Sequence, residues 1–142
     1  MKLAKTGAVL FVLWGVLHML GGAAILAAAA GSPDAGYATY DPAASGYTAL
    51  AGDVLAYLAW GFAWIGALVA WVAIRYNWRN SEAGLALNTV LVGLTDLGLL
   101  LFLVLPGHLG WAEASPGLAL FAAAALAGGF ACRAAGHPAH AV

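Results

Sequence analysis

Charged residues are scarce in this sequence of 142 residues, of which lysine, arginine, aspartate and glutamate make up only 8%. A soluble globular domain carries about 25% charged residues. Because 64% of the residues are hydrophobic, the chain has too few polar side chains to cover a surface in water, and we expect lipid to be its main solvent. The net charge of −1 argues against a nucleic-acid partner, since nothing here would offset the phosphates.

Cysteine is limited to one residue, Cys132. A single thiol excludes an intrachain disulfide, a CxxC redox centre and a zinc-finger site. The sequence also lacks a glycine-rich phosphate loop, a GxSxG nucleophile elbow and an HExxH zinc motif. These absences remove the common signatures of an enzyme, and no pattern points to a particular cofactor.

Long apolar stretches are what the sequence has instead. A helix needs about 20 apolar residues to cross the hydrocarbon core of a bilayer. Four stretches meet or approach this length, at residues 6–30, 48–76, 82–105 and 116–133. The first is longer than the core of a signal peptide, which has about 7–15 apolar residues, and we expect it to be retained as a span.

The ends of the last two spans have recognisable signals. Asn80 or Ser81 is expected to cap the third span, with Glu82 well placed in its first turn. Ser115 is expected to cap the fourth span, with Pro116 at the first helical position, where its missing N–H costs nothing.

The connections predict the topology. Residues 31–47 form the only long loop between spans, whereas 77–81 and 107–115 are short and make the spans that they join antiparallel neighbours. We therefore predict one all-α domain over residues 1–142, an integral membrane four-helix bundle with up-down-up-down topology and left-handed packing.

Basic residues predict the orientation. With four spans, every lysine and arginine falls on one side of the membrane, which the positive-inside rule makes the cytoplasmic side. These residues are Lys2, Lys5, Arg75, Arg79 and Arg133. We expect both termini in the cytoplasm and a multi-pass protein of a bacterial inner membrane or other plasma membrane.

Two ionisable residues, His18 and Asp96, fall near the middle of the first and third spans. A charged group at that depth is costly unless it faces the bundle interior and has a partner, so we predict that the two form a pair. Asn88, Thr95 and Asp96 share about 80° of a helical wheel. The predicted intramembrane polar site therefore consists of His18, Asp96, Thr95 and Asn88.

Three roles are open for this polar site. It holds helices together, binds a ligand or ion, or transfers protons. A metal site is not expected, because only two ligand side chains converge.

Aromatic residues recur on one side of the second span. Within about 60° of a helical wheel lie Asp53, Tyr57, Trp60, Trp64 and Trp71. Trp60 and Trp64 are too deep for the interfacial aromatic belts, and an indole N–H in hydrocarbon needs an acceptor. Tyr57 and Trp71 suit the two interfacial belts. The predicted ligand or partner face consists of Asp53, Tyr57, Trp60 and Trp64 together with Trp14 of the first span, with ordinary packing as the alternative.

A third group of polar residues gathers at the outer end of the predicted bundle. It includes His108, Glu113 and Asp41. Such a surface attracts a cation, docks an outer partner or is simply a wetted cap.

Three functions follow as hypotheses. The first is a non-catalytic accessory or structural subunit of a larger membrane complex, in contact with lipids and with other subunits or further copies of itself. The second is a protein that binds or transports a lipid, quinone, pigment or ion at a site formed by His18 and Asp96. The third is a membrane enzyme that uses the same pair as acid and base.

Overall fold

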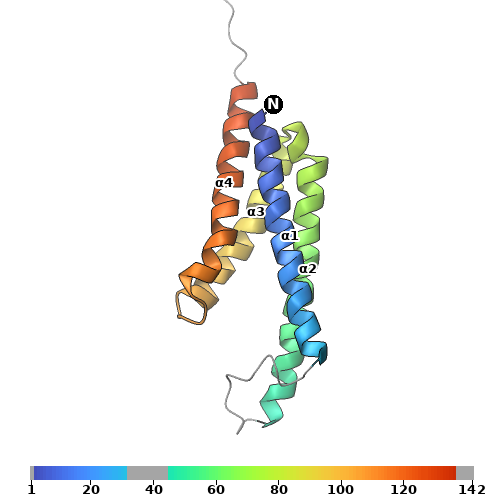
Figure 1. The fold of residues 1–142 in the computed structure, drawn as a ribbon. Helices are drawn as coiled ribbons and strands as arrows, with labels where there is room; N and C mark the ends of the chain where they lie inside the picture. The colour runs from blue at the N-terminus through green and yellow to red at the C-terminus, as the bar shows by residue number, and fades with distance from the viewer. Residues whose placement is uncertain (1, 32–44, 137–142) are drawn as a thin grey trace, which may run out of the picture. The chain divides into compact units, whose positions relative to one another are not determined.

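Four long helices make up most of the chain (Figure 1). The computed structural model describes residues 2–31 and 45–136. The helices are α1 (Lys2–Gly31), α2 (Ser45–Arg75), α3 (Glu82–Leu99) and α4 (Trp111–Gly136), with a 3₁₀ turn η2 (Asn77–Arg79) and a π-helical turn η3 (Leu100–Val104). No strand occurs in these two stretches.

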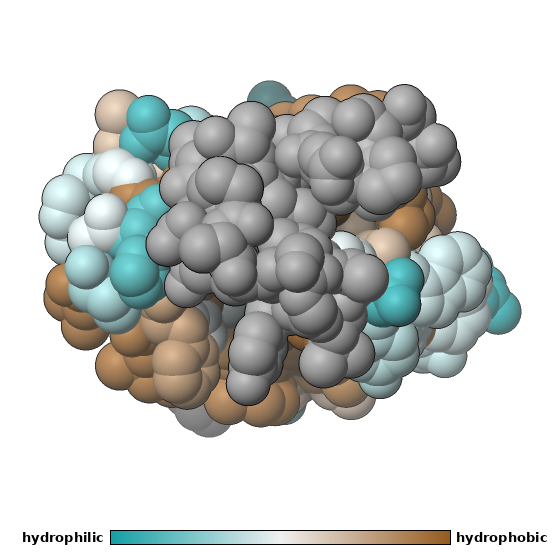
Figure 2. All heavy atoms as spheres, turned by 90° about the horizontal axis from the view of Figure 1, so that it is seen from below, coloured by the Kyte–Doolittle hydropathy of each residue, from teal (hydrophilic) through white to brown (hydrophobic). Residues whose placement is uncertain are grey.

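Each long helix contains a segment that is long and apolar enough to cross a membrane. At most 28% of the most apolar window of each helix is buried within the chain, so much of each helix surface is left for lipid or other proteins. Figure 2 shows patches of apolar side chains, coloured brown, on the surface visible from one end, beside paler and hydrophilic ones. The prediction of an all-helical chain with four such helices is confirmed for the described residues.

Contacts group the helices into two compact units. Unit 1 combines residues 1–15 with residues 68–142, and unit 2 comprises residues 16–67. Each unit therefore contains part of α1 and part of α2, and each is described by itself below.

Small residues bring the helices of unit 1 together. A Cβ atom added to Gly7 of α1 would lie 3.0 Å from the backbone nitrogen of Gly128 and 3.1 Å from the carbonyl oxygen of Ala124, both on α4. Helices that pack in lipid approach closely through such small residues. α4 also contacts α3, where Gly93 lies against the ring of Phe121, and the two helices run antiparallel (Figure 1).

A tight turn joins α2 to α3 and satisfies its own backbone. Asn80 adopts the left-handed conformation with φ of 58°, and its N–H donates to the Asn77 carbonyl at 2.9 Å. The next N–H, of Ser81, donates back to the Tyr76 carbonyl at 3.2 Å. This pair of bonds is a Schellman motif, in which asparagine replaces the usual glycine.

Ser81 then starts α3. Its hydroxyl oxygen accepts the N–H of Gly84 at 3.2 Å, and Glu82 occupies the first turn. The prediction of a polar cap at this position is therefore confirmed, with Ser81 as the cap.

The other end of α3 widens before it stops. In η3 the N–H of Leu105 donates to the Leu100 carbonyl, five residues back, at 2.9 Å. Gly107 follows with φ of 82°, and the N–H of His108 donates to the Leu103 carbonyl at 2.8 Å. The helix thus ends in a second Schellman motif directly after Pro106, where the sequence predicts the stop.

The expected start of α4 at Pro116 is wrong, because the helix begins at Trp111. Pro116 lies inside it and has no N–H to offer the carbonyl of Ala112, four residues back. The hydroxyl of Ser115 donates to that carbonyl instead, at 3.3 Å. Ser115 is therefore not a cap. It supplies the hydrogen bond that proline cannot make.

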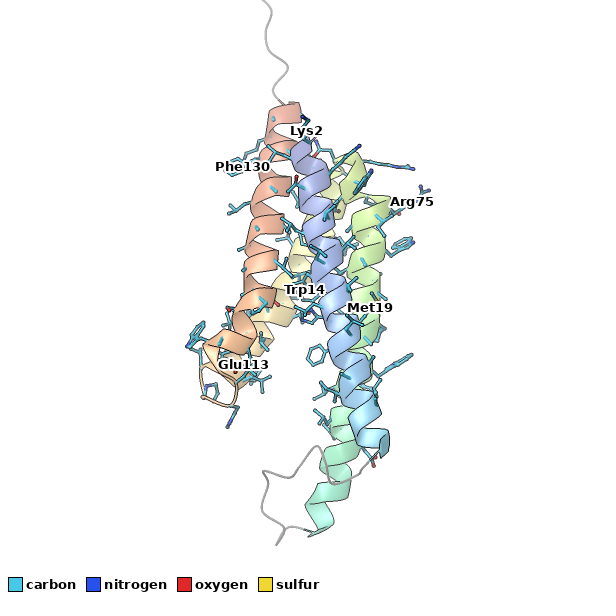
Figure 3. The ribbon with its side chains drawn as sticks, in the orientation of Figure 1. Lys2, Trp14, Met19, Arg75, Glu113 and Phe130 are labelled. Atoms are coloured by element: carbon cyan, nitrogen blue, oxygen red, sulfur yellow. The ribbon has the colours of Figure 1, made fainter. Side chains whose placement is uncertain are left out.

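All basic side chains of the chain lie at one end of unit 1. Lys5 lies over the ring of Trp78 in η2, with 5.4 Å between its ammonium nitrogen and the ring centroid. On the α4 side, Asn80 donates to the Ala131 carbonyl at 3.2 Å. Figure 3 shows Lys2 and Arg75 at this same end and Glu113 at the opposite one. We call this the basic end of unit 1; it contains Lys2, Lys5, Arg75, Arg79 and Arg133.

Unit 2 is held by an equally close approach. A Cβ atom added to Gly22 of α1 would lie 2.5 Å from the carbonyl oxygen of Ala59 and 3.1 Å from the side chain of Ala63, both on α2. Ala59 is fully buried. The two helix segments of this unit therefore pack backbone against backbone.

Gly84 and Gly98 provide a matched test of this packing on α3. A methyl group at Gly84 would meet the Cβ atom of Tyr76 and lie 2.6 Å from the Asn77 side chain, whereas at Gly98 it would meet nothing within 4 Å. We expect Gly84→Ala to lower the free energy of unfolding by about 1–3 kcal/mol through overpacking, and Gly98→Ala to cause no loss. The unfolding temperature of each variant is measured in detergent, with the reaction of Cys132 with a thiol dye as the signal of unfolding. Equal unfolding temperatures would contradict the turn geometry.

Candidate functional site

The candidate site starts from one face of α3. Gly84, Asn88, Val92 and Asp96 follow one another at steps of four residues and are all buried. Residues four apart lie on the same side of a helix. The polar side of this span therefore points into the protein, and Asp96 is only 3% exposed.

Trp14 of α1 is the hydrogen-bond partner of Asp96. Its indole nitrogen donates to Oδ1 of Asp96 at 3.3 Å, and the indole is fully buried. Figure 3 shows Trp14 on the part of α1 that belongs to unit 1. The second carboxyl oxygen, Oδ2, is buried without a hydrogen-bond partner.

The other two predicted polar residues of α3 are bound locally. Asn88 is fully buried, and its amide donates to the Val69 carbonyl of α2 at 3.2 Å, while its own oxygen has no partner. The hydroxyl of Thr95 donates to the Leu91 carbonyl of the same helix at 2.8 Å. Asn88 thus ties α3 to α2, whereas Thr95 satisfies itself within its own turn.

His18 belongs to unit 2, and Asp96 belongs to unit 1. The imidazole is half-buried and meets the ring of Phe62 edge-on, with 6.2 Å between the ring centroids. The predicted pairing of His18 with Asp96 stays a prediction.

The aromatic residues of α2 point outward. Tyr57, Trp60 and Trp64 are 75%, 61% and 50% exposed. With Gly61 between them, where an added Cβ atom would meet nothing within 4 Å, they border an open groove of about 340 Å³. We call this surface the aromatic face of α2. Its groove is lined by Tyr57, Leu58, Trp60, Gly61, Phe62, Trp64 and Ile65.

The other residues of the predicted ligand or partner face, and Trp71 of the same helix, are not among the residues that line this groove. Trp14 is fully buried in unit 1. Asp53 is exposed near the start of α2. Trp71 is exposed and packs edge-on against the ring of Tyr76, with 5.7 Å between the centroids. The groove therefore involves only three of the residues predicted for that face.

At the end of unit 1 opposite the basic end, His108 and Glu113 are both exposed. His108 lies in the turn after η3, and Glu113 lies in the first turn of α4 with its carboxylate over Gly110. Asp41, the third member of the predicted outer cluster, lies outside the described residues. Among the residues that are described, no group of three histidine, cysteine or acidic side chains is placed to hold a metal ion.

Trp14 is the site residue that sequence reasoning missed as a partner of Asp96. α1 begins at Lys2 rather than near Thr6, so depth has to be counted from there. Trp14 then follows the helix start by 12 residues (14 minus 2), and Asp96 follows the start of α3 by 14 (96 minus 82). His18 follows the same start by 16 (18 minus 2), so the true helix start makes Trp14 and His18 equally good matches to Asp96, and counting alone would have added the indole as a candidate partner.

Comparison with known proteins adds nothing to this geometry. No protein-family model matches the chain, and neither does any curated protein or solved structure. The function must therefore be argued from the side chains themselves.

A double-mutant cycle tests the bond between α1 and α3. Trp14→Phe leaves Oδ1 of Asp96 buried without a donor and should cost about 1–3 kcal/mol of unfolding free energy. Asp96→Leu leaves the indole N–H unpaired and should also destabilise. The double variant should lose less than the sum of the two single losses, because neither group is then left unsatisfied. Unfolding in detergent measures all three.

Trp64→Phe is the matched control for this cycle, because it removes an indole that is half exposed and carries no hydrogen bond to a described residue. It should leave the unfolding free energy unchanged. Strictly additive losses in the double variant would mean that Trp14 and Asp96 do not interact.

Proposed function

We propose that this chain is an integral membrane protein that crosses the bilayer four times with both termini in the cytoplasm. We further propose that it serves as a non-catalytic subunit of a larger assembly in a bacterial inner membrane or other plasma membrane. The observation that carries the subunit role is the aromatic face of α2, where two tryptophans within an apolar span point away from the chain.

Membrane placement is supported by the solvent that the outer surface requires. Large apolar side chains are exposed on every helix, for example Leu20, Leu94 and Leu126, each more than 60% exposed. Capping bonds satisfy backbone N–H groups in the turn between α2 and α3 and in the turn after η3, and the helices bond their own backbone, as a hydrocarbon environment demands. Lipid is the solvent that suits both features.

The orientation is supported by the basic end of unit 1. Five basic residues gather there, at the level of the turn between α2 and α3. Glu113 lies at the opposite end. The positive-inside rule assigns an end with an excess of lysine and arginine to the cytoplasm.

Cysteine labelling tests this orientation. In a Cys132→Ser background, single cysteines are introduced as Arg79→Cys at the basic end and His108→Cys at the other; both native residues are exposed. In spheroplasts, whose inner membrane is intact, a membrane-impermeant thiol reagent should label His108→Cys at once. It should label Arg79→Cys only after permeabilisation. The reverse pattern would invert the topology, and labelling of both without permeabilisation would refute membrane spanning.

The subunit role is supported by the two deep indoles. Trp64 lies near the middle of the apolar segment Gly52–Arg79, and Trp60 lies one turn before it. Neither side chain forms a hydrogen bond with any of the described residues. An indole N–H in hydrocarbon costs free energy unless an acceptor binds it. A neighbouring membrane protein would supply such an acceptor from a polar side chain or a backbone carbonyl.

The shape of the groove favours a protein over a small ligand. All of its lining residues belong to α2, so a molecule lying in it is contacted from one helix. Ligand sites usually enclose 70–90% of a bound small molecule (a typical range). A partner helix needs no such enclosure, because it packs along α2 and approaches closely at Gly61, which has no side chain.

The alanine-rich fourth helix is not the surface on which the proposal depends. Its smallest residues pack inside unit 1, with Gly128 against Gly7 of α1 and against the side chain of Leu85 of α3. This side of α4 is therefore used within the chain, which leaves the aromatic face of α2 as the stronger candidate.

Photo-crosslinking in native membranes tests the partner. Replacement of Trp64 by p-benzoylphenylalanine should give a covalent adduct with another membrane protein, or with a second copy of this chain. The same replacement at Phe130 of α4, which is 57% exposed, should give mainly lipid adducts. Lipid adducts alone at both positions would end the subunit proposal and favour a lipid-binding role for the groove.

A second function, ligand or ion binding at Asp96, is favoured by the buried carboxyl oxygen that has no hydrogen-bond partner. A catalytic role has less support. The hydrogen-bond partner of Asp96 is an indole, which donates a hydrogen bond but does not exchange protons as a general base does.

A further inference from the structure

The buried carboxyl group of Asp96 accepts fewer hydrogen bonds than an ionised carboxylate needs. An ionised carboxylate has about four positions at which it accepts hydrogen bonds. Asp96 receives one, from Trp14 to Oδ1, and its length of 3.3 Å is at the long end for an N–H···O bond. Oδ2 is buried and accepts none. Neutral indole is the donor, so the bond brings no positive charge.

The surroundings of Asp96 in unit 1 are uncharged. Its hydrogen-bond donor Trp14 on α1 and Val92, one turn before it on α3, are both fully buried and uncharged. Asn88, two turns before Asp96, uses its amide on the Val69 carbonyl. No ion pair joins Asp96 to a residue in the described part of the chain. Burial of a charge without a counter-ion costs so much that such a group usually neutralises instead.

The charged side chains that α1, α2, α3 and α4 contribute to unit 1 lie near its ends. On α3 itself, Glu82 precedes Asp96 by 14 residues (96 minus 82), which corresponds to about 21 Å along the helix. Glu113 and the imidazole of His108 lie at the opposite end from the basic residues. Among the side chains that the structure describes in unit 2, the titratable groups on α1 and α2 are His18, Asp53 and Tyr57, and the first of them enters the test below.

We propose that Asp96 is a proton-binding site within the membrane, and that its carboxyl carries a proton on Oδ2 at neutral pH. In this form Oδ1 is a carbonyl oxygen that suits the single N–H of Trp14, and no charge is buried. The ligand of the site is the hydrogen ion. The inference rests on the membrane-spanning part of the proposed function and is independent of the partner on α2.

A protonated carboxyl in hydrocarbon has a distinctive reactivity toward hydrophobic carbodiimides. The acid proton moves to a carbodiimide nitrogen, and the carboxyl oxygen bonds to the central carbon to give an O-acylisourea. In a dry site the acyl group then migrates to nitrogen and gives a stable N-acylurea. Nothing leaves, so the labelled peptide gains the whole mass of the reagent.

The experiment treats the full-length protein in liposomes with dicyclohexylcarbodiimide at neutral pH and maps the adducts by peptide mass spectrometry. We expect the adduct on Asp96 and not on Asp34, Asp41 or Asp53, the other aspartates of the chain. A water-soluble carbodiimide should not label Asp96. Labelling should decline as the pH rises and the proton is lost. Because the label is located in the native sequence, the result does not depend on a variant that folds.

Infrared spectroscopy of protein labelled with ¹³C-aspartate gives a second readout. At neutral pH the native protein should show the C=O band of a protonated carboxyl, and Asp96→Asn should lack it. Absence of both the band and the adduct from the native protein would overturn the inference. His18→Ala should leave both unchanged. If that variant gains a band and an adduct that the native protein lacks, Asp96 is natively ionised beside a cationic imidazole, which would also overturn it.

The outcome is separable from that of the proposed function. Cysteine labelling reports whether the chain spans the membrane, and crosslinking from Trp64 reports the partner. Absence of both the adduct and the C=O band, together with correct labelling at His108→Cys, would refute the proton site alone.

Discussion

The close approach of helix backbones at small residues is the constraint on which unit 1 depends. Gly7 lets α1 lie against Gly128 of α4 with almost no side chain between them. On the same side of α1, Phe11 lies four residues after Gly7 and Trp14 lies seven residues after it. Both side chains are fully buried. The approach at Gly7 therefore allows the indole of Trp14 to reach α3 and the carboxyl of Asp96 to receive its hydrogen bond.

The two polar features of the spans differ in what they need. Asp96 is enclosed by its own chain and is short of hydrogen-bond donors. Trp60 and Trp64 are donors that face outward and are short of acceptors. In the two proposals above, a proton neutralises the first and a neighbouring protein satisfies the second. The two proposals are independent of each other.

Much of this fold could be predicted from the sequence because its signals are local. Length and hydropathy identify four helices, and the cap at Ser81 and the stop at Pro106 depend on residues within one turn. The start of α4 could not be predicted, because the hydroxyl of Ser115 compensates for the missing N–H of Pro116. A serine followed by a proline is typical of a helix start, so the sequence alone does not show that this pair lies inside a helix.

The partner of Asp96 could not be predicted for a different reason. α1 is apolar on all sides, so its sequence does not show which side faces the protein. Its buried side is set by Gly7 and by small residues on other helices, which are long-range contacts. The outward position of Trp64 is likewise a property of how α2 packs. The sequence gives the position of these residues along each helix, but it does not show the direction in which their side chains point.

The wide turn η3 has a geometric consequence for the face that carries Asp96. Residues spaced by four drift slowly around an α-helix, because its turn holds about 3.6 residues. The buried positions 84, 88, 92 and 96 follow that drift. In a π-helical turn such as η3, each N–H bonds to the carbonyl five residues back, so the turn holds more residues than an α-helical turn. The residues after it are therefore rotated against the direction of that drift. Val104 is buried again. The wide turn η3 thus keeps one side of the last helical turn on the buried side of the helix.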